Sequence, residues 1–116
     1  FIPLSNSITS INSGVFSHCS MLSSITIPNS IISVGYGAFS HCCSLKSVAI
    51  PSSVTSIGEY AFYKCGILSS IMIPRSVASI GKEAFEDCSK LMTVSVPEGL
   101  KYPPNAFPKG AKISKY

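Results

Sequence analysis

The chain has 116 residues, of which 46% are hydrophobic and only 12% are charged. This composition is enough to bury one hydrophobic core and excludes an intrinsically disordered chain. Serine interrupts every hydrophobic run, so no stretch reaches the roughly 18 apolar residues of a membrane-spanning helix, and we expect no membrane insertion. The net charge of +4 is concentrated near the end, where residues 97–116 carry four lysines and one glutamate.

A regular repeat runs through most of the sequence. Cysteine, phenylalanine, leucine, proline and isoleucine or valine recur in eight columns at one constant step, with the unit I-x-I-P-x-S-V-x-S-I-G-x-x-A-F-x-x-C-x-x-L-x-x. Such repeats indicate coils that stack on one another, because a single repeat cannot bury its own apolar face. We therefore predict four 23-residue repeats within residues 1–96.

The N-terminal edge departs from this unit. The chain starts at Phe1 without a targeting motif, which indicates a processed product or a piece of a longer protein. Ile2-Pro3 is typical of the tail of a preceding strand, displaced by two residues from Ser5, which aligns with the repeat prolines. We therefore predict a truncated, uncapped edge that is open to end-to-end contact.

The first element of each repeat is a short strand. In residues 68–74 the isoleucines Ile71 and Ile73 alternate with Ser70 and Met72, which is the period of a half-buried strand. Pro74 ends the strand because proline has no N–H to continue the ladder.

A second extended piece and a helical turn are expected after the proline. Residues 77–80 form the extended piece, and Gly81 ends it. Residues 84–91 then place alanine, phenylalanine, cysteine and leucine at helical spacing behind charged residues. This pattern predicts one or two turns of α- or 3₁₀-helix with an outer face in water.

The pattern decays after Pro97. Pro103 and Pro104 replace the isoleucine-glycine pair, and Ala106-Phe107 comes one residue early. A solenoid needs a modified end unit to cover its last core layer. Residues 97–116 are therefore predicted to be a degenerate repeat that acts as a C-terminal cap.

The motif C-x-x-L-x-x-I-x-I-P, followed by S-I-G-x-x-A-F, resembles the BspA-like leucine-rich repeats. It occurs at Cys42–Pro51 and again at Cys65–Pro74. The resemblance implies a right-handed α/β solenoid with a parallel β-sheet on the concave side and short helical turns on the convex side. It also implies a non-enzymatic protein-binding or adhesion module at the cell surface or secreted, with a host matrix or cell-surface protein as ligand. The alternative is a cytoplasmic scaffold or a structural spacer within a longer repeat array.

The cysteines and histidines invite a disulfide or metal interpretation, which the spacing disfavours. Neighbouring coils lie about 4.8 Å apart, beyond the ~3.8 Å between the Cβ atoms of a disulfide. The columnar cysteines are therefore predicted to be buried thiols, and the additional Cys43 to be exposed. His18 and His41 should form a solvated pair on adjacent coils, away from the cysteines, so no metal site is predicted.

Catalytic and nucleic-acid functions find little support. No histidine is paired with an orienting carboxylate, and no glycine-rich phosphate loop occurs, so we predict no catalytic residues and no cofactor. Lys101-Tyr102 and Lys115-Tyr116 are too sparse for the interleaved aromatic and basic residues that bind single-stranded nucleic acid, and no nucleic-acid partner is expected.

The outward side of the strands is the candidate ligand surface. Its residues are short and weakly charged, which suits broad protein contact better than a deep pocket. Met72 and Arg75 resemble a binding hot spot, although a merely solvated surface remains the alternative. The candidate face consists of Ser24, Thr26, Ser47, Ala49, Ser70, Met72, Arg75, Thr93 and Ser95.

Overall fold

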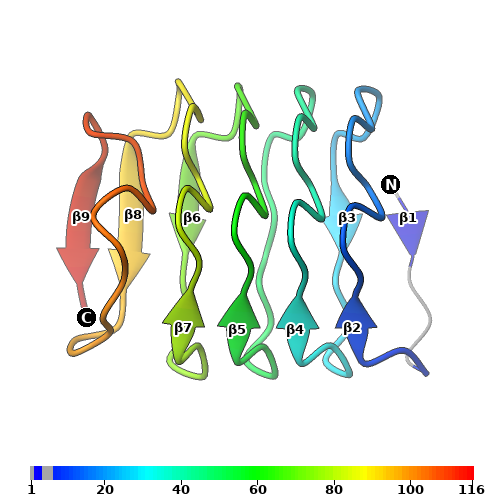
Figure 1. Cartoon of the computed structure of the whole chain (residues 1–116), viewed down its shortest axis with the longest axis horizontal. Helices are drawn as coiled ribbons and strands as arrows, with labels where there is room; N and C mark the ends of the chain where they lie inside the picture. The colour runs from blue at the N-terminus through cyan, green and yellow to red at the C-terminus, as the bar shows by residue number, and fades with distance from the viewer. Residues whose placement is uncertain (1, 4–6) are drawn as a thin grey trace.

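The computed structural model describes residues 2–3 and 7–116 and has the form of a β-solenoid. Successive coils stack along the longest axis of the molecule, with the two termini at opposite ends (Figure 1). Short strands lie in two layers, and the strands of one layer run opposite to those of the other. The buried side chains of both layers form a single hydrophobic core between them.

Each layer is a parallel ladder. In the first ladder an isolated bridge between Thr26 and Ala49 stands where the second coil would contribute a strand. The first ladder is divided into two sheets, one of β1 (Ile2–Pro3) and β3 (Ile25–Thr26), the other of β6 (Ser70–Met72), β8 (Thr93–Val96) and β9 (Lys112–Lys115). The second ladder contains β2 (Ser10–Ile11), β4 (Ser33–Val34), β5 (Ser56–Ile57) and β7 (Ser79–Ile80).

The strand predictions are confirmed. Ile71 and Ile73 are buried, whereas Ser70 and Met72 are exposed, as the alternation requires. The partner of each second-ladder residue lies exactly one repeat further along the chain, for example Ile57 opposite Ile80. The repeat period and the parallel sheet are therefore one and the same feature.

The predicted helical turns are wrong. No helix occurs in residues 2–3 and 7–116, and the segment predicted to be helical has turns at residues 82–87 and 89–90 instead. Its amides do not follow a helical pattern: the Phe85 amide donates to the Ala106 carbonyl of the next coil at 2.8 Å. In addition, Glu83 and Asp87 have φ angles of 55° and 59°, which a right-handed helix cannot contain. Bonding between coils therefore replaces bonding within a helix.

These left-handed positions offer a direct stability test at Glu83. The equivalent residues of the first two coils are Gly14 and Gly37, also at positive φ. A side chain at positive φ lowers stability by roughly 1–2 kcal/mol. Replacing it with glycine removes this cost, but the greater freedom of glycine in the unfolded chain offsets part of the gain. Glu83→Gly is therefore expected to raise the free energy of unfolding by about 0.5–1 kcal/mol in urea titrations.

The reciprocal variant Gly37→Ala should lower the free energy of unfolding by a similar amount. It places a Cβ at a φ of 59°, and the nearest atom to that Cβ is the Ser40 Cβ at 3.8 Å. Strain, rather than a clash, would then be the cause. If both variants were as stable as the parent protein, the left-handed conformation would carry no energetic cost for a side chain at this repeat position, which would contradict the prediction.

A stack of phenylalanine rings runs through the core. Successive ring centroids lie 5.0–5.3 Å apart, with interplanar angles of 4–18°. The three central rings have no exposed surface. The members of the stack are Phe16, Phe39, Phe62, Phe85 and Phe107.

The glycine of the S-I-G motif marks the closest approach of neighbouring coils. A Cβ built on Gly58 would lie 2.8 Å from the backbone carbon of Gly35 and from the Tyr36 nitrogen. The Gly58 amide donates to the Val34 carbonyl at 2.8 Å, which draws the two coils together. The motif therefore needs glycine for space and not only to end a strand.

Both ends depart from what the sequence suggested. Ile2 pairs with Ile25, so β1 keeps the regular repeat register and is not displaced, while Ser5 lies outside the described residues. At the other end β9 pairs with β8, and Phe107 completes the ring stack despite its shifted position. The role of residues 97–116 as a cap stays a prediction.

Candidate ligand-binding surfaces

The first ladder brings the predicted candidate face together. Ser70 lies opposite Thr93, and Met72 lies opposite Ser95 on the neighbouring strand. Met72 is 61% exposed, which makes it a large apolar contact available to a partner. Of the other candidates, Ser24 and Ser95 are half-buried, and the exposed ones are Thr26, Ser47, Ala49, Ser70 and Thr93.

Arg75 is not the free donor that the sequence suggested. Its guanidinium carbon lies 4.6 Å from the centroid of the Tyr116 ring, a cation–π contact. The Tyr116 hydroxyl donates a hydrogen bond to the Ile73 carbonyl, which fixes the ring beside the strand. Arg75 is therefore held at the edge of the candidate face by the end of the chain.

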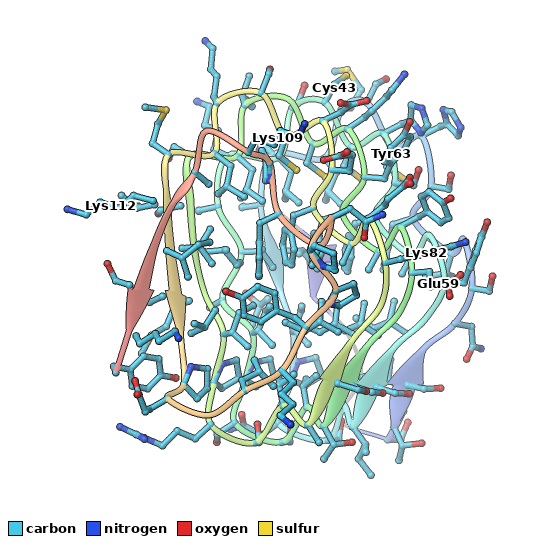
Figure 2. All side chains as sticks on the ribbon, turned by 60° about the vertical axis from the view of Figure 1, so that its left-hand side comes forward. Cys43, Glu59, Tyr63, Lys82, Lys109 and Lys112 are labelled. Atoms are coloured by element: carbon cyan, nitrogen blue, oxygen red, sulfur yellow. The ribbon has the colours of Figure 1, made fainter. Side chains whose placement is uncertain are left out.

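Strand β9 adds residues that the sequence reasoning missed. Lys112 pairs with Thr93 and carries a positive charge to the end of the candidate face. Figure 2 shows Lys112 projecting from this side of the molecule, away from Tyr63 and Lys82. The alternation Lys112-Ile113-Ser114-Lys115 was a usable strand signal. The repeat pattern does not reveal this strand, because Ile113 follows its partner Val94 at a shorter step than the regular repeat.

A second surface, formed by aromatic and basic side chains of the turns, was also missed. Tyr36 and Tyr63 meet Tyr60 edge to face, with centroids 5.4 and 5.3 Å away. Tyr63 also contacts His41 at 5.6 Å, and His41 stacks on His18 at 4.3 Å with an angle of 13°. We call the set Tyr36, Tyr60, Tyr63, His18, His41 and Lys64 the turn-side surface.

The predicted histidine pair is confirmed, and its environment is electropositive. His18 is exposed and His41 half-buried. Burial, with the nearby His18 and Lys64, lowers the pKa of His41. The Ser40 hydroxyl lies 2.8 Å from the His41 Nδ1 and holds the ring in place. No three His, Cys, Asp or Glu side chains of the described residues converge as metal ligands would.

The columnar cysteines form a ladder of their own. The Sγ atoms of Cys42, Cys65 and Cys88 donate to the backbone carbonyl of the phenylalanine in the preceding coil, at 3.0–3.3 Å. All five cysteines are free, and Cys43 is exposed as predicted, whereas Cys19 in the first coil is only half-buried. Burial raises the pKa of Cys42 to about 11, and the Cys88 thiol and burial raise the pKa of Cys65.

We expect alkylation of the folded protein to distinguish these thiols. Iodoacetamide reacts with the thiolate, so the exposed Cys43 should be modified rapidly, while Cys42, Cys65 and Cys88 stay protected. Intact mass after brief treatment at about pH 8 should show modification at Cys43, with slower addition at Cys19. After denaturation all five thiols should react. Equally fast reaction of Cys65 and Cys43 would contradict the buried ladder.

None of the described residues forms a helix of the length and apolar character needed to cross a membrane. The family model described as BspA type leucine rich repeat region matches residues 1–114 with 6 copies. No curated protein matches the chain.

Several solved structures are similar to this chain. A leucine-rich repeat protein from Bacteroides ovatus is 31% identical over 93% of this chain and 28% of that chain, with a TM-score of 0.89. A leucine rich cell surface protein from Faecalibacterium prausnitzii is 30% identical over 98% and 31%, with a TM-score of 0.92. The T. pallidum leucine rich repeat protein is 28% identical over 94% and 51%, with a TM-score of 0.83. This chain thus spans less than a third of the first two proteins.

Proposed function

This chain belongs to the BspA-type leucine-rich repeat family, and from that membership we propose that it is a non-enzymatic protein-binding or adhesion module displayed at a cell surface. The ligand surface is the candidate face on the first ladder. One observation carries the proposal: the ladder presents exposed, short and mostly uncharged side chains around the large apolar Met72. Removing water from such a surface costs little free energy, because few of its groups are charged. It therefore suits a broad protein partner.

Two further observations support this placement. The similar protein from Faecalibacterium prausnitzii is described as a cell surface protein, which motivates the location. Lys112 and Arg75 border the face and add charge at its rim, where charge steers association without a large cost of desolvation. The expected ligand is a host matrix or cell-surface protein.

The second candidate function is an intracellular scaffold or a spacer between other repeats. The free thiols favour it, since disulfides are rare in the reducing cytosol. A spacer has no ligand of its own, so replacing outward residues of the first ladder would leave binding by the longer protein unchanged.

The experiment compares two charge-matched variants. Ser70→Glu with Met72→Glu places two carboxylates on the candidate face, whereas Ala78→Glu with Ser79→Glu places two at exposed positions in and beside the second ladder. Binding to immobilised matrix proteins and to extracted host surface proteins is measured by surface plasmon resonance. Circular dichroism checks the folding of each variant.

We expect the first-ladder variant to lose binding by about tenfold or more, because buried unpaired charge is costly, and the second-ladder variant to bind like the parent. Loss of binding only in the second-ladder variant would reject the candidate face. Unchanged binding of both variants would place the ligand outside the candidate face, whereas no binding by the parent protein would favour the spacer.

A further inference from the structure

Two shallow hollows adjoin on the turn-side surface, away from the candidate face. The first, about 350 Å³, is lined chiefly by serine hydroxyls, two glycines and the rings of Tyr36, Tyr60 and Tyr63. The second, about 500 Å³, is lined by His18, Ser20, His41, Cys43 and Lys64. The contact between Tyr63 and His41 joins them, so a single extended ligand could occupy both.

The aromatic hollow has an unusual combination of groups. Its lining contains no aliphatic side chain, only aromatic rings, serines and glycines. Tyr36 is 56% exposed, and the perpendicular packing of Tyr60 on Tyr63 presents both ring faces and ring edges. Rings beside hydroxyls suit a ligand that has an apolar C–H face and many hydroxyl groups, which is the surface of a sugar ring.

The second hollow, which we call the basic hollow, is lined by basic side chains. His18, His41 and Lys64 line it, and no carboxylate does. Glu59 is the first acidic residue of the whole sequence, so the coils that carry the two histidines contain no Asp or Glu. The Lys64 Nζ lies 5.5 Å from the centroid of the Tyr63 ring, so the cation stands where the two hollows meet. Glu83 and Glu59 lie close enough to act on Tyr60 at the other end of the tyrosine row. An anionic group of a bound ligand would therefore be favoured beside Lys64 and the histidines and not beside Tyr60.

We propose that the turn-side surface binds an acidic oligosaccharide, with sugar rings on the tyrosines and sulfate or carboxylate groups on His18, His41 and Lys64. An acidic polypeptide fits less well. Peptides are usually held by an open strand edge or by apolar pockets for their side chains, and the lining of the two hollows offers neither. The site is independent of the candidate face proposed above.

The backbone at this surface suits the designed variants. His18, His41 and Lys64 all have φ angles of 60–63°, a region in which asparagine is well tolerated. Replacement with asparagine therefore removes each basic side chain with little added strain. Lys82→Asn is the matched control, since Lys82 lines neither hollow.

The test measures binding of three hexasaccharides by isothermal titration calorimetry: a heparin-derived one, hexagalacturonate and neutral maltohexaose. We expect the parent protein to bind the acidic sugars with a Kd below about 1 mM, and more weakly when salt rises from about 50 to about 300 mM. Binding of the sulfated sugar alone identifies sulfate as the preferred group. Binding of both acidic sugars identifies the negative charge.

The variants separate the two hollows. The triple variant His18→Asn, His41→Asn and Lys64→Asn should weaken acidic-sugar binding by on the order of tenfold. Tyr36→Ala should weaken it by about threefold or more through the lost ring face, whereas Lys82→Asn should leave it unchanged. Circular dichroism and the thermal midpoint confirm that each variant is folded.

A pH series gives an independent readout. The titratable and charged groups around His41 are His18, Lys64, Tyr63 and Cys43, with Asp87 at the position equivalent to Lys64 in the next coil. Burial lowers the pKa of His41, so this ring gains its positive charge only as the pH falls into the acidic range. Binding should therefore strengthen toward the lower pH in the parent, but much less in the triple variant.

The proposal is overturned if no acidic sugar binds, or if maltohexaose binds as tightly as the acidic sugars. Equal binding by a poly-glutamate peptide of similar charge would transfer the site to a polypeptide partner and would also overturn it. Binding that survives in the triple variant would place the sugar elsewhere on the molecule. None of these results bears on the candidate face, whose variants Ser70→Glu with Met72→Glu are tested separately.

Discussion

Gly81→Ala is expected to lower the free energy of unfolding by about 3 kcal/mol or more. A Cβ at this position would lie 2.7 Å from the backbone carbon of Gly58, and closer still to the backbone nitrogen of Glu59. Backbone atoms of the preceding coil cannot rotate away as a flexible side chain can. The coils would have to separate, which would lengthen the bond that the Gly81 amide donates to the Ile57 carbonyl at 2.8 Å.

Gly66→Ala is the matched control. It makes the same chemical change in the same region of the chain, but nothing lies within 4 Å of the added Cβ. It should be neutral or stabilising by up to about 0.5 kcal/mol, because alanine has less freedom in the unfolded chain. Urea titrations followed by circular dichroism measure both variants. Similar stability of the two alanine variants would contradict close approach as the reason for the repeat glycine.

Phe62→Ala should cost about 3–5 kcal/mol of stability. The Phe62 ring is fully buried and stacks between Phe39 and Phe85, with centroids 5.0 Å away on each side. Truncation would open a cavity in the middle of the stack. The flanking rings cannot close it, because each is held by its own backbone bonds to the neighbouring coils.

Two comparisons make this result specific. Phe16→Ala, at a half-buried ring near the N-terminal end, should cost clearly less than Phe62→Ala. Met72→Ala removes a side chain that is 61% exposed and should change stability by less than about 0.5 kcal/mol. A loss below about 1 kcal/mol for Phe62→Ala would reject the ring stack as the centre of the core.

The sequence predicted the period, the strands and the buried cysteine column, because each follows from residues that recur at equal steps. It failed at the helical turns. Phenylalanine, cysteine and leucine at three- and four-residue steps suit a helix, but they suit equally a chain of turns that bonds to the next coil. Residues at positive φ, such as His41 and Asp87, exclude a helix, but their spacing in the sequence does not reveal this conformation.

The two candidate surfaces also differ in how far the sequence could predict them. Outward residues such as Ser70 and Met72 could be predicted because strand alternation fixes the side on which they lie. Tyr36, Tyr60 and Tyr63 belong to three different columns, and only the stacking of coils brings their rings together. The contact of Tyr116 with Arg75 could not be predicted, because β9 pairs with β8 at a shorter offset than the repeat step.

The identical bonding between neighbouring coils has a consequence for how such proteins change over generations. The amides of Gly35, Gly58 and Gly81 each donate to the equivalent carbonyl of the coil before, at 2.7–2.8 Å. Any coil can therefore follow any other, and a duplicated repeat inserts without altering the joints on either side. A duplicated copy carries all the residues that its folding requires. Mutation can then act on its outward positions alone, so binding surfaces diversify while the scaffold stays constant.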